Sequence, residues 1–150
     1  MLYDKLTFDL KTAMKVSAHE RTSALRFVIA QIRNREIEKR TKGNAVPLTD
    51  DEIIDVMKRE VKRRVEAVKL FRAGKREELA RKEEVEIAMI KEYLPPELTH
   101  AEIAAIVDGI WKRGMRDFNL LIREAMKEVK GRADGEAVKD AIKAKIDGLA

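Results

Sequence analysis

Apolar residues recur every three or four positions along most of the chain, which is the spacing of one face of an α-helix. Short polar or glycine-containing breaks interrupt the pattern, for example at Thr41-Lys42-Gly43-Asn44 and Ala73-Gly74. We expect seven helices, at about residues 2–16, 18–40, 50–72, 75–94, 102–112, 118–129 and 135–149. No segment alternates apolar and polar residues for long enough to indicate a strand, so the predicted fold class is all-α.

Three of the predicted helices begin with the pattern Ser/Thr-x-x-Glu. In such a capping box the hydroxyl accepts a hydrogen bond from the third helical amide, and the glutamate accepts one from the amide of the capping residue. The pattern occurs at Ser17–Glu20, Thr49–Glu52 and Thr99–Glu102. We therefore expect a helix to start at each of these positions.

Two adjacent prolines, Pro95 and Pro96, follow the predicted fourth helix in the stretch Tyr93–Leu98. Proline lacks the amide hydrogen that a helix needs, and it moves the preceding residue away from the helical conformation. The prolines therefore indicate a boundary between an N-terminal helical domain of about four helices, residues 1–94, and a small three-helix C-terminal domain, residues 95–150. The alternative is a turn within one continuous bundle.

Catalytic chemistry finds little support in the sequence. The chain of 150 residues has no cysteine and two histidines. His19 and His100 each lie within two residues of a predicted helix cap, and nothing nearby resembles a nucleophile with a base and an orienting group. The chain also lacks the glycine-rich phosphate loops and the HExxH zinc motif. We therefore expect no catalytic residues, no cofactor and no metal site. The acidic residues Glu83, Glu84 and Glu86 are interpreted as surface salt-bridge partners.

Cellular location follows from absences of a different kind. The first residues do not show a cationic stretch followed by an apolar core, so no signal peptide is expected. No apolar run is long enough to cross a bilayer. The sequence therefore predicts a cytoplasmic protein without membrane contact.

The 32 Lys and Arg exceed the 27 Asp and Glu, and the excess is concentrated in two clusters. Residues 58–82 hold eleven cations against four acids, and residues 112–132 hold seven against three. A basic helix face can neutralise the phosphates of a nucleic acid. The alternative interpretation is a solvated helix face stabilised by local ion pairs, which we favour for the larger cluster. For the smaller cluster, Lys130-Gly131-Arg132 lies at an inter-helix break where side chains and amides can meet one ligand.

Several short motifs together resemble the YqeY family, small bacterial proteins of the GatB/YqeY group, over almost the whole chain. The motifs are Ala13-Met14-Lys15, Leu25-Arg26, the run Lys58–Arg64, Glu86 with Tyr93-Leu94-Pro95, and Met126 followed by Lys130-Gly131-Arg132-Ala133-Asp134. The resemblance implies an α-helical N-terminal domain joined to a smaller helical domain. Where the family usually has a Gly-Lys pair before its methionine, this chain reads Arg123-Glu124-Ala125-Met126.

The resemblance also implies a function. The family's C-terminal domain is similar to the tail of the B subunit of the tRNA-dependent amidotransferase, which helps to hold the tRNA, and related modules occur on some glutaminyl-tRNA synthetases. It therefore implies a non-catalytic, tRNA-associated accessory protein, with either enzyme as a partner. Classification as a carbon-nitrogen ligase with glutamine as amido-N-donor would be inherited from that likeness. The expected tRNA-binding residues are Arg123, Lys127, Lys130, Gly131 and Arg132, with Met126 and Ala133 at matching positions.

Two other hypotheses come from different classes. The first is a helical adaptor that binds a protein partner, which requires a contiguous apolar patch around Tyr93, Leu94, Leu98 and Trp111. Alternatively, the chain supplies a tail-like partner to an amidotransferase, with activity only in the mixture. Salt distinguishes tRNA binding from the adaptor hypothesis, because phosphate contacts weaken as ionic strength rises whereas an apolar interface hardly responds.

Overall fold

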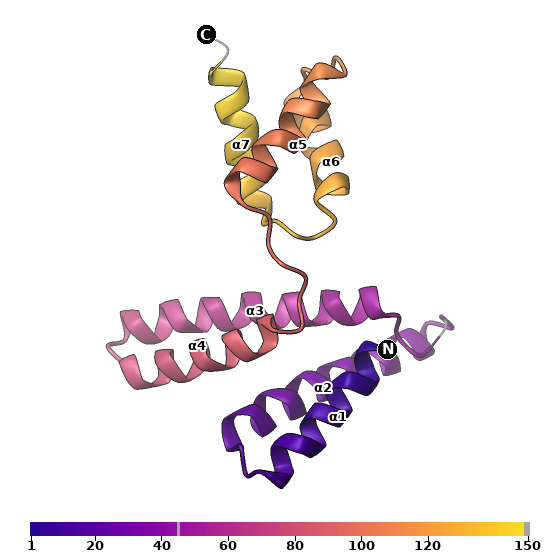
Figure 1. Ribbon diagram of the computed structural model, residues 1–150, viewed down its shortest axis with the longest axis vertical. Coiled ribbons are helices and arrows are strands. Elements are labelled where there is room, and N and C mark those ends of the chain that lie inside the picture. Colours follow the sequence, from indigo (N-terminus) through magenta and orange to yellow (C-terminus); the bar gives the residue numbers. More distant parts are fainter. Residues whose placement is uncertain (45, 149–150) are drawn as a thin grey trace. The chain divides into compact units, whose positions relative to one another are not determined.

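The computed structural model describes residues 1–44 and 46–148, and these residues contain helices but no strand. This confirms the all-α prediction. The helices, drawn in Figure 1, are α1 (Leu2–Lys15), α2 (His19–Thr41), α3 (Asp50–Ala73), α4 (Glu77–Lys91), α5 (His100–Lys112), α6 (Phe118–Val129) and α7 (Gly135–Asp147). The bounds agree with the predicted ones within three residues. The predicted end of the last helix at Leu149 lies outside the described residues.

The chain divides into two compact units between Leu94 and Pro95. Helices α1 to α4 form the first unit, and α5 to α7 form the second. Each unit has a hydrophobic core of its own, and the two sets of core residues do not overlap.

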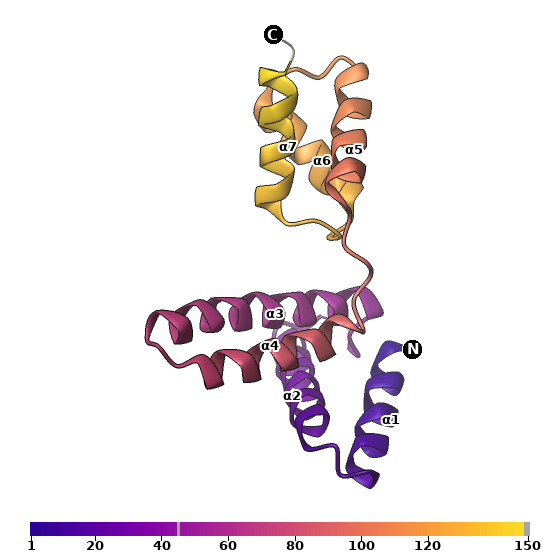
Figure 2. The same ribbon diagram turned by 60° about the vertical axis from the view of Figure 1, so that its left-hand side comes forward.

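The first unit consists of two helical hairpins, α1 with α2 and α3 with α4, which both views show (Figures 1 and 2). Helix α2 contacts all three other helices. It therefore buries residues on more than one side, and its buried positions include the neighbouring pairs Ala24-Leu25 and Val28-Ile29. The core of the first unit is completed by Leu6 of α1, Ile53 and Met57 of α3, and Ile90 of α4.

The second unit is a three-helix bundle in which every helix contacts the other two. Its core contains apolar side chains that recur at spacings of three and four along each helix, as an amphipathic helix requires. They are Ile103, Val107 and Ile110 of α5, Leu121, Ala125 and Val129 of α6, and Val138 and Ile142 of α7.

Two of the three predicted capping boxes are present. The hydroxyl of Thr49 accepts from the Glu52 amide at 3.2 Å, and the Glu52 carboxylate accepts from the Thr49 amide at 2.8 Å. Thr99 and Glu102 repeat this geometry at the start of α5. The hydrogen bond from the Thr99 amide holds the pKa of Glu102 below its ordinary value. Glu102 therefore favours folding at neutral pH, and this contribution is lost as the pH falls through the lowered pKa.

The capping box predicted at Ser17 is wrong. Ser17 lies in the left-handed region, with φ of 56°. The amide of Ala18 donates to the carbonyl of Ala13 at 2.9 Å, which is the hydrogen bond that closes a Schellman motif at a helix end. Ser17 therefore ends α1, and the residue at the start of α2 is Ala18, which has no side-chain cap.

The contrast between these two positions gives a testable difference in stability. Thr49→Ala removes a hydroxyl that caps α3, so we expect the free energy of unfolding of the first unit to fall by about 1 kcal/mol. Ser17→Ala removes a hydroxyl that caps nothing and should change it by less than about 0.5 kcal/mol. Urea titrations followed by circular dichroism measure both variants. Equal losses would contradict the assignment of the cap.

A buried cluster of charges connects α3 and α4. The side chain of Arg64 is 9% exposed, and those of Glu60 and Glu86 are 6% and 9% exposed. The Arg64 guanidinium lies 3.0 Å from both Glu60 and Glu83, and Nη1 also donates to Glu86. The guanidinium also lies over the ring of Phe27 from α2, with 5.0 Å between the Arg64 Cζ and the ring centroid. The interpretation of Glu86 as a surface residue is therefore wrong, because this carboxylate is buried as the partner of Arg64.

Exposure changes sharply between two neighbouring residues of α4. Leu79 is 39% exposed, whereas the next residue, Ala80, is completely buried. Ala80 packs with Val68 and Ile87 in a small separate cluster between α3 and α4. The close pairing of the two helices places the small side chain inside.

Candidate nucleic-acid interface

Helix α6 carries most of the residues predicted to bind tRNA. It starts at Asp117, whose carboxylate accepts from the Leu120 amide at 3.0 Å. Its buried residues are Leu121, Ala125 and Val129, at a constant spacing of four. These three side chains direct one face of α6 into the core of the second unit, so the opposite face lies in solvent.

The solvent face of α6 brings together three of the predicted site residues. Arg123 and Lys127 are exposed, and their spacing of four places them on one side of the helix. Lys130, which is also exposed, directly follows the last residue of α6. Apolar residues lie on the same side, since Leu120 is 44% exposed and Met126 is 37% exposed. We call Arg123, Lys127 and Lys130 the α6 basic face.

The cations of the α6 basic face are only partly neutralised. Lys127 pairs with Glu124 at 3.1 Å, and both side chains are on the surface, where such a pair is weak. Within residues 1–44 and 46–148, neither Arg123 nor Lys130 has an acidic partner. Two cations are therefore available to an external anion, and the third is held loosely.

The turn after α6 is left-handed at two successive residues. Lys130 has φ of 49° and Gly131 has φ of 73°. Glycine adopts this conformation without strain, but a residue with a Cβ pays roughly 1–2 kcal/mol for it. Backbone strain of this kind is concentrated at functional sites in proteins. Here it keeps a long cationic side chain at the end of the α6 basic face.

Arg132 has a different environment from the other candidates. Its Nε donates to the Pro96 carbonyl at 2.9 Å, and its own carbonyl accepts from the Leu98 amide at 2.8 Å. Its amide donates to the Val129 carbonyl at 2.9 Å. Arg132 thus fixes the segment before α5 to the turn between α6 and α7, and its amide is already used inside the protein.

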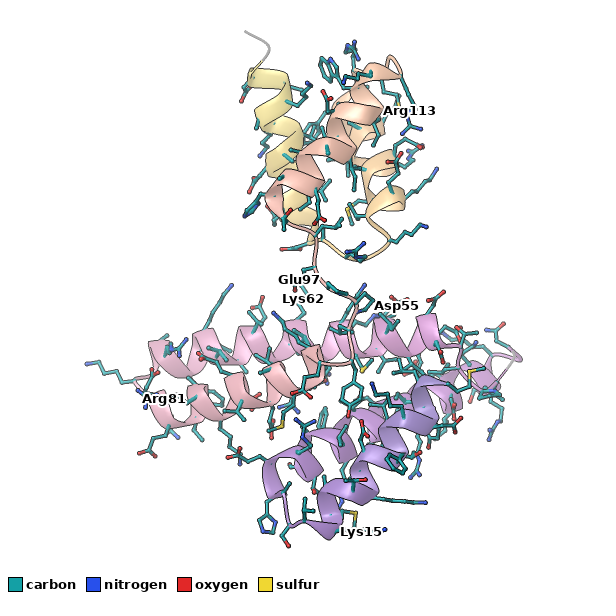
Figure 3. The ribbon with its side chains drawn as sticks, in the orientation of Figure 1. Lys15, Asp55, Lys62, Arg81, Glu97 and Arg113 are labelled. Atoms are coloured by element: carbon teal, nitrogen blue, oxygen red, sulfur yellow. The ribbon has the colours of Figure 1, made fainter. Side chains whose placement is uncertain are left out.

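Other cations of the second unit have partners inside the unit. Lys112 pairs with Asp108 at 3.0 Å, and Arg113 pairs with Glu128. Arg113 lies just beyond the end of α5, as Figure 3 shows. Arg116 stacks over the ring of Trp111 with 4.1 Å between Cζ and the ring centroid. The sequence analysis did not connect Trp111 with Arg116, because nothing in the spacing of the two residues indicates a stack.

The larger basic cluster, residues 58–82, is extensively paired. Besides Arg64, Arg63 pairs with Glu60 at 2.9 Å, while Arg72 pairs with Glu77 at 3.2 Å. Lys62 points away from α4 into solvent (Figure 3). Several arginines of this cluster therefore form ion pairs within α3 or between α3 and α4.

The four residues of the adaptor hypothesis divide between the two units. Tyr93 and Leu94 pack against the core of the first unit, and Leu98 and Trp111 pack against the core of the second. The hydroxyl of Tyr93 donates to Asp9, and burial raises the pKa of this phenol above its ordinary value. All four side chains are partly buried within their own units.

Among residues 1–44 and 46–148, no group of three or more histidine or acidic side chains is placed to hold a metal ion. In the same part of the chain, no helix combines the length and the apolar character needed to cross a bilayer.

Comparison with known proteins identifies relatives in yeasts. The chain is 31% identical over 103 residues to "Altered inheritance of mitochondria protein 41, mitochondrial" of Eremothecium gossypii, covering 67% of this chain and 54% of the relative. The protein of the same name from Lachancea thermotolerans is 30% identical over 145 residues, covering 92% of this chain and 75% of the relative. This chain spans about half the length of the first relatives that it matches.

These relatives correct the prediction of a cytoplasmic protein. The matching proteins of Eremothecium gossypii, Candida glabrata, Lachancea thermotolerans and Clavispora lusitaniae are all named as mitochondrial. The cytoplasmic prediction rested only on the missing signal peptide and membrane span, and the names of the relatives outweigh it.

The family comparison covers almost the entire chain. The family described as Yqey-like protein matches residues 3–146, which include all seven helices except the first and last residues of the fold. The motifs that carried the resemblance lie within this range. The bacterial origin and the likeness to an amidotransferase tail stay predictions. The chain belongs to the Yqey-like protein family.

Proposed function

We propose that this protein binds tRNA through the α6 basic face and acts as a non-catalytic accessory protein. The observation that carries the proposal is that Arg123 and Lys127 on α6 and Lys130 directly after it are all exposed, and that Arg123 and Lys130 have no acidic partner in the described part of the chain. Such a group of cations is suited to the phosphates of a nucleic-acid backbone, because each contact releases condensed counterions.

The choice of tRNA over other polyanions rests on the family resemblance. The C-terminal helical domain resembles the tail of the amidotransferase B subunit, and the basic face lies on the corresponding unit of this chain. The tRNA amidotransferase and glutaminyl-tRNA synthetase are the enzymes that this accessory protein would assist. A carbon-nitrogen ligase label would then describe the assisted enzyme.

The structure also refines the proposed contacts. Arg132 holds the segment before α5 through Pro96 and Leu98, so its role in the proposed site is to position the turn. Gly131 allows the left-handed turn that follows Lys130. Direct phosphate contact is assigned to the three cations of the α6 basic face.

A filter-binding titration with tRNA at 50 and 200 mM salt tests the proposal, with a random RNA of equal length as competitor. Three phosphate contacts predict a slope of log K against log salt of about −2 to −3, so affinity should fall roughly 16- to 64-fold between these concentrations. The random RNA should compete poorly. Binding that does not respond to salt would reject the phosphate interface and favour a protein-binding adaptor.

A further inference from the structure

The guanidinium of Arg116 lies over the ring of Trp111, the single tryptophan of the chain. The Cζ of Arg116 is 4.1 Å from the centroid of the Trp111 ring. Nη1 of the same guanidinium donates to the Trp111 carbonyl and, at 3.1 Å, to the Met115 carbonyl. The stack and the two hydrogen bonds together fix the plane of the guanidinium.

The stack has a buried side and an open side. Trp111 is partly buried and packs against the core of the second unit, whereas Arg116 is exposed. Within residues 1–44 and 46–148, Arg116 has no acidic partner. A guanidinium has five N–H donors, and the two carbonyl bonds use only Nη1, so the three N–H groups of Nη2 and Nε are not engaged by them.

We propose that Arg116, supported by Trp111, is a stacking subsite for an unpaired nucleobase of the bound RNA. This inference rests on the proposed RNA binding and adds to it a contact with a base. Bases stack on guanidinium planes as well as on aromatic rings, and the face of any base can do so. A guanidinium that is already fixed in position loses little conformational entropy when a base stacks on it.

The position of the subsite fits the α6 basic face. Arg116 lies two residues before the start of α6, and Lys130 lies directly after its end. The 12 residues of α6 span about 18 Å. The two positions therefore flank α6 along the chain, and the proposed path of a single strand runs along this helix, with phosphates on its cations and a base on Arg116.

The test separates the base from the phosphates. A single-stranded adenylate oligonucleotide and an abasic oligonucleotide of equal length carry the same number of phosphates, and only the first can stack. We expect the wild-type protein to bind the adenylate about tenfold more tightly, the contribution typical of one stacked base. Adenylate binding should also change the fluorescence of Trp111, the one tryptophan of the chain.

Arg116→Lys is the decisive variant, because it keeps the charge but removes the plane. It should bind the two oligonucleotides nearly equally, with an unchanged salt slope. Arg113→Lys, in the same loop and paired with Glu128, is the matched control and should retain the tenfold preference. Circular dichroism melts establish that both variants are folded.

The possible outcomes distinguish the two proposals. The stacking subsite is overturned, and RNA binding stays in place, if the Arg116→Lys variant still prefers the adenylate over the abasic oligonucleotide. The same conclusion follows if the wild-type protein shows no such preference. If the wild-type protein binds neither of the two oligonucleotides nor tRNA, both proposals are overturned. Loss of the preference in Arg116→Lys alone supports the subsite.

Discussion

Arg64→Met is expected to lower the free energy of unfolding of the first unit by about 3–5 kcal/mol. The reason is the state of the carboxylates that the substitution leaves behind. Glu60 and Glu86 have side chains that are 6% and 9% exposed, and Arg64 lies between them. Without the guanidinium, two buried negative charges lose their main compensation. Domains of this kind have total stabilities of about 5–15 kcal/mol, so the loss is a large fraction.

The neighbouring residue offers a matched control. Arg63 also pairs with Glu60, at 2.9 Å, but its side chain is 65% exposed. Arg63→Met should therefore cost less than about 1 kcal/mol. Adding Glu86→Gln to Arg64→Met should recover part of the lost stability, because it removes one uncompensated charge. Denaturant titrations followed by far-UV circular dichroism measure all three variants, and similar losses for Arg63→Met and Arg64→Met would refute the argument.

Replacing Arg123, Lys127 and Lys130 together with alanine is expected to weaken tRNA binding by on the order of 10²- to 10³-fold at 50 mM salt. Each phosphate contact contributes close to one unit to the slope of log K against log salt, so the slope should decrease in magnitude by about two to three. The change should leave the fold intact, since all three side chains are exposed.

The control for this variant removes equal charge from elsewhere in the second unit. Replacing Lys112, Lys139 and Lys143 with alanine also lowers the formal net charge of +5 by three, but these residues lie on α5 and α7. If binding depends on the α6 basic face, this control keeps most of its affinity and its salt slope. Equal weakening of both variants would mean that net charge alone attracts the RNA.

Local patterns were the most reliable guide to the fold. The bounds of α6 were predicted without error, because Leu121, Ala125 and Val129 recur on one face and glycines lie close to both ends. The caps at Thr49 and Thr99 were also correct, since a capping box is a complete hydrogen-bonding unit within four residues.

Features that depend on contacts between residues far apart in the chain could not be predicted from the sequence. The pattern that suggested a cap at Ser17 cannot show that the backbone there is left-handed, and the short connection between α1 and α2 decides this. Burial of Glu86 requires Arg64, 22 positions away on another helix. The hydrogen bond from Arg132 to the Pro96 carbonyl joins residues 36 positions apart, which lie side by side only in the folded unit.

The pairing of neighbouring helices has a consequence for the order of folding. Hairpins such as α1 with α2 and α3 with α4 are closed by residues near one another in the chain, and helical domains of this kind fold in microseconds to milliseconds. At about 5–20 residues per second, a ribosome needs roughly 3–11 s to add the second unit. The first unit, with a separate core ending at Leu94, would thus complete its folding while the second unit is still being synthesised.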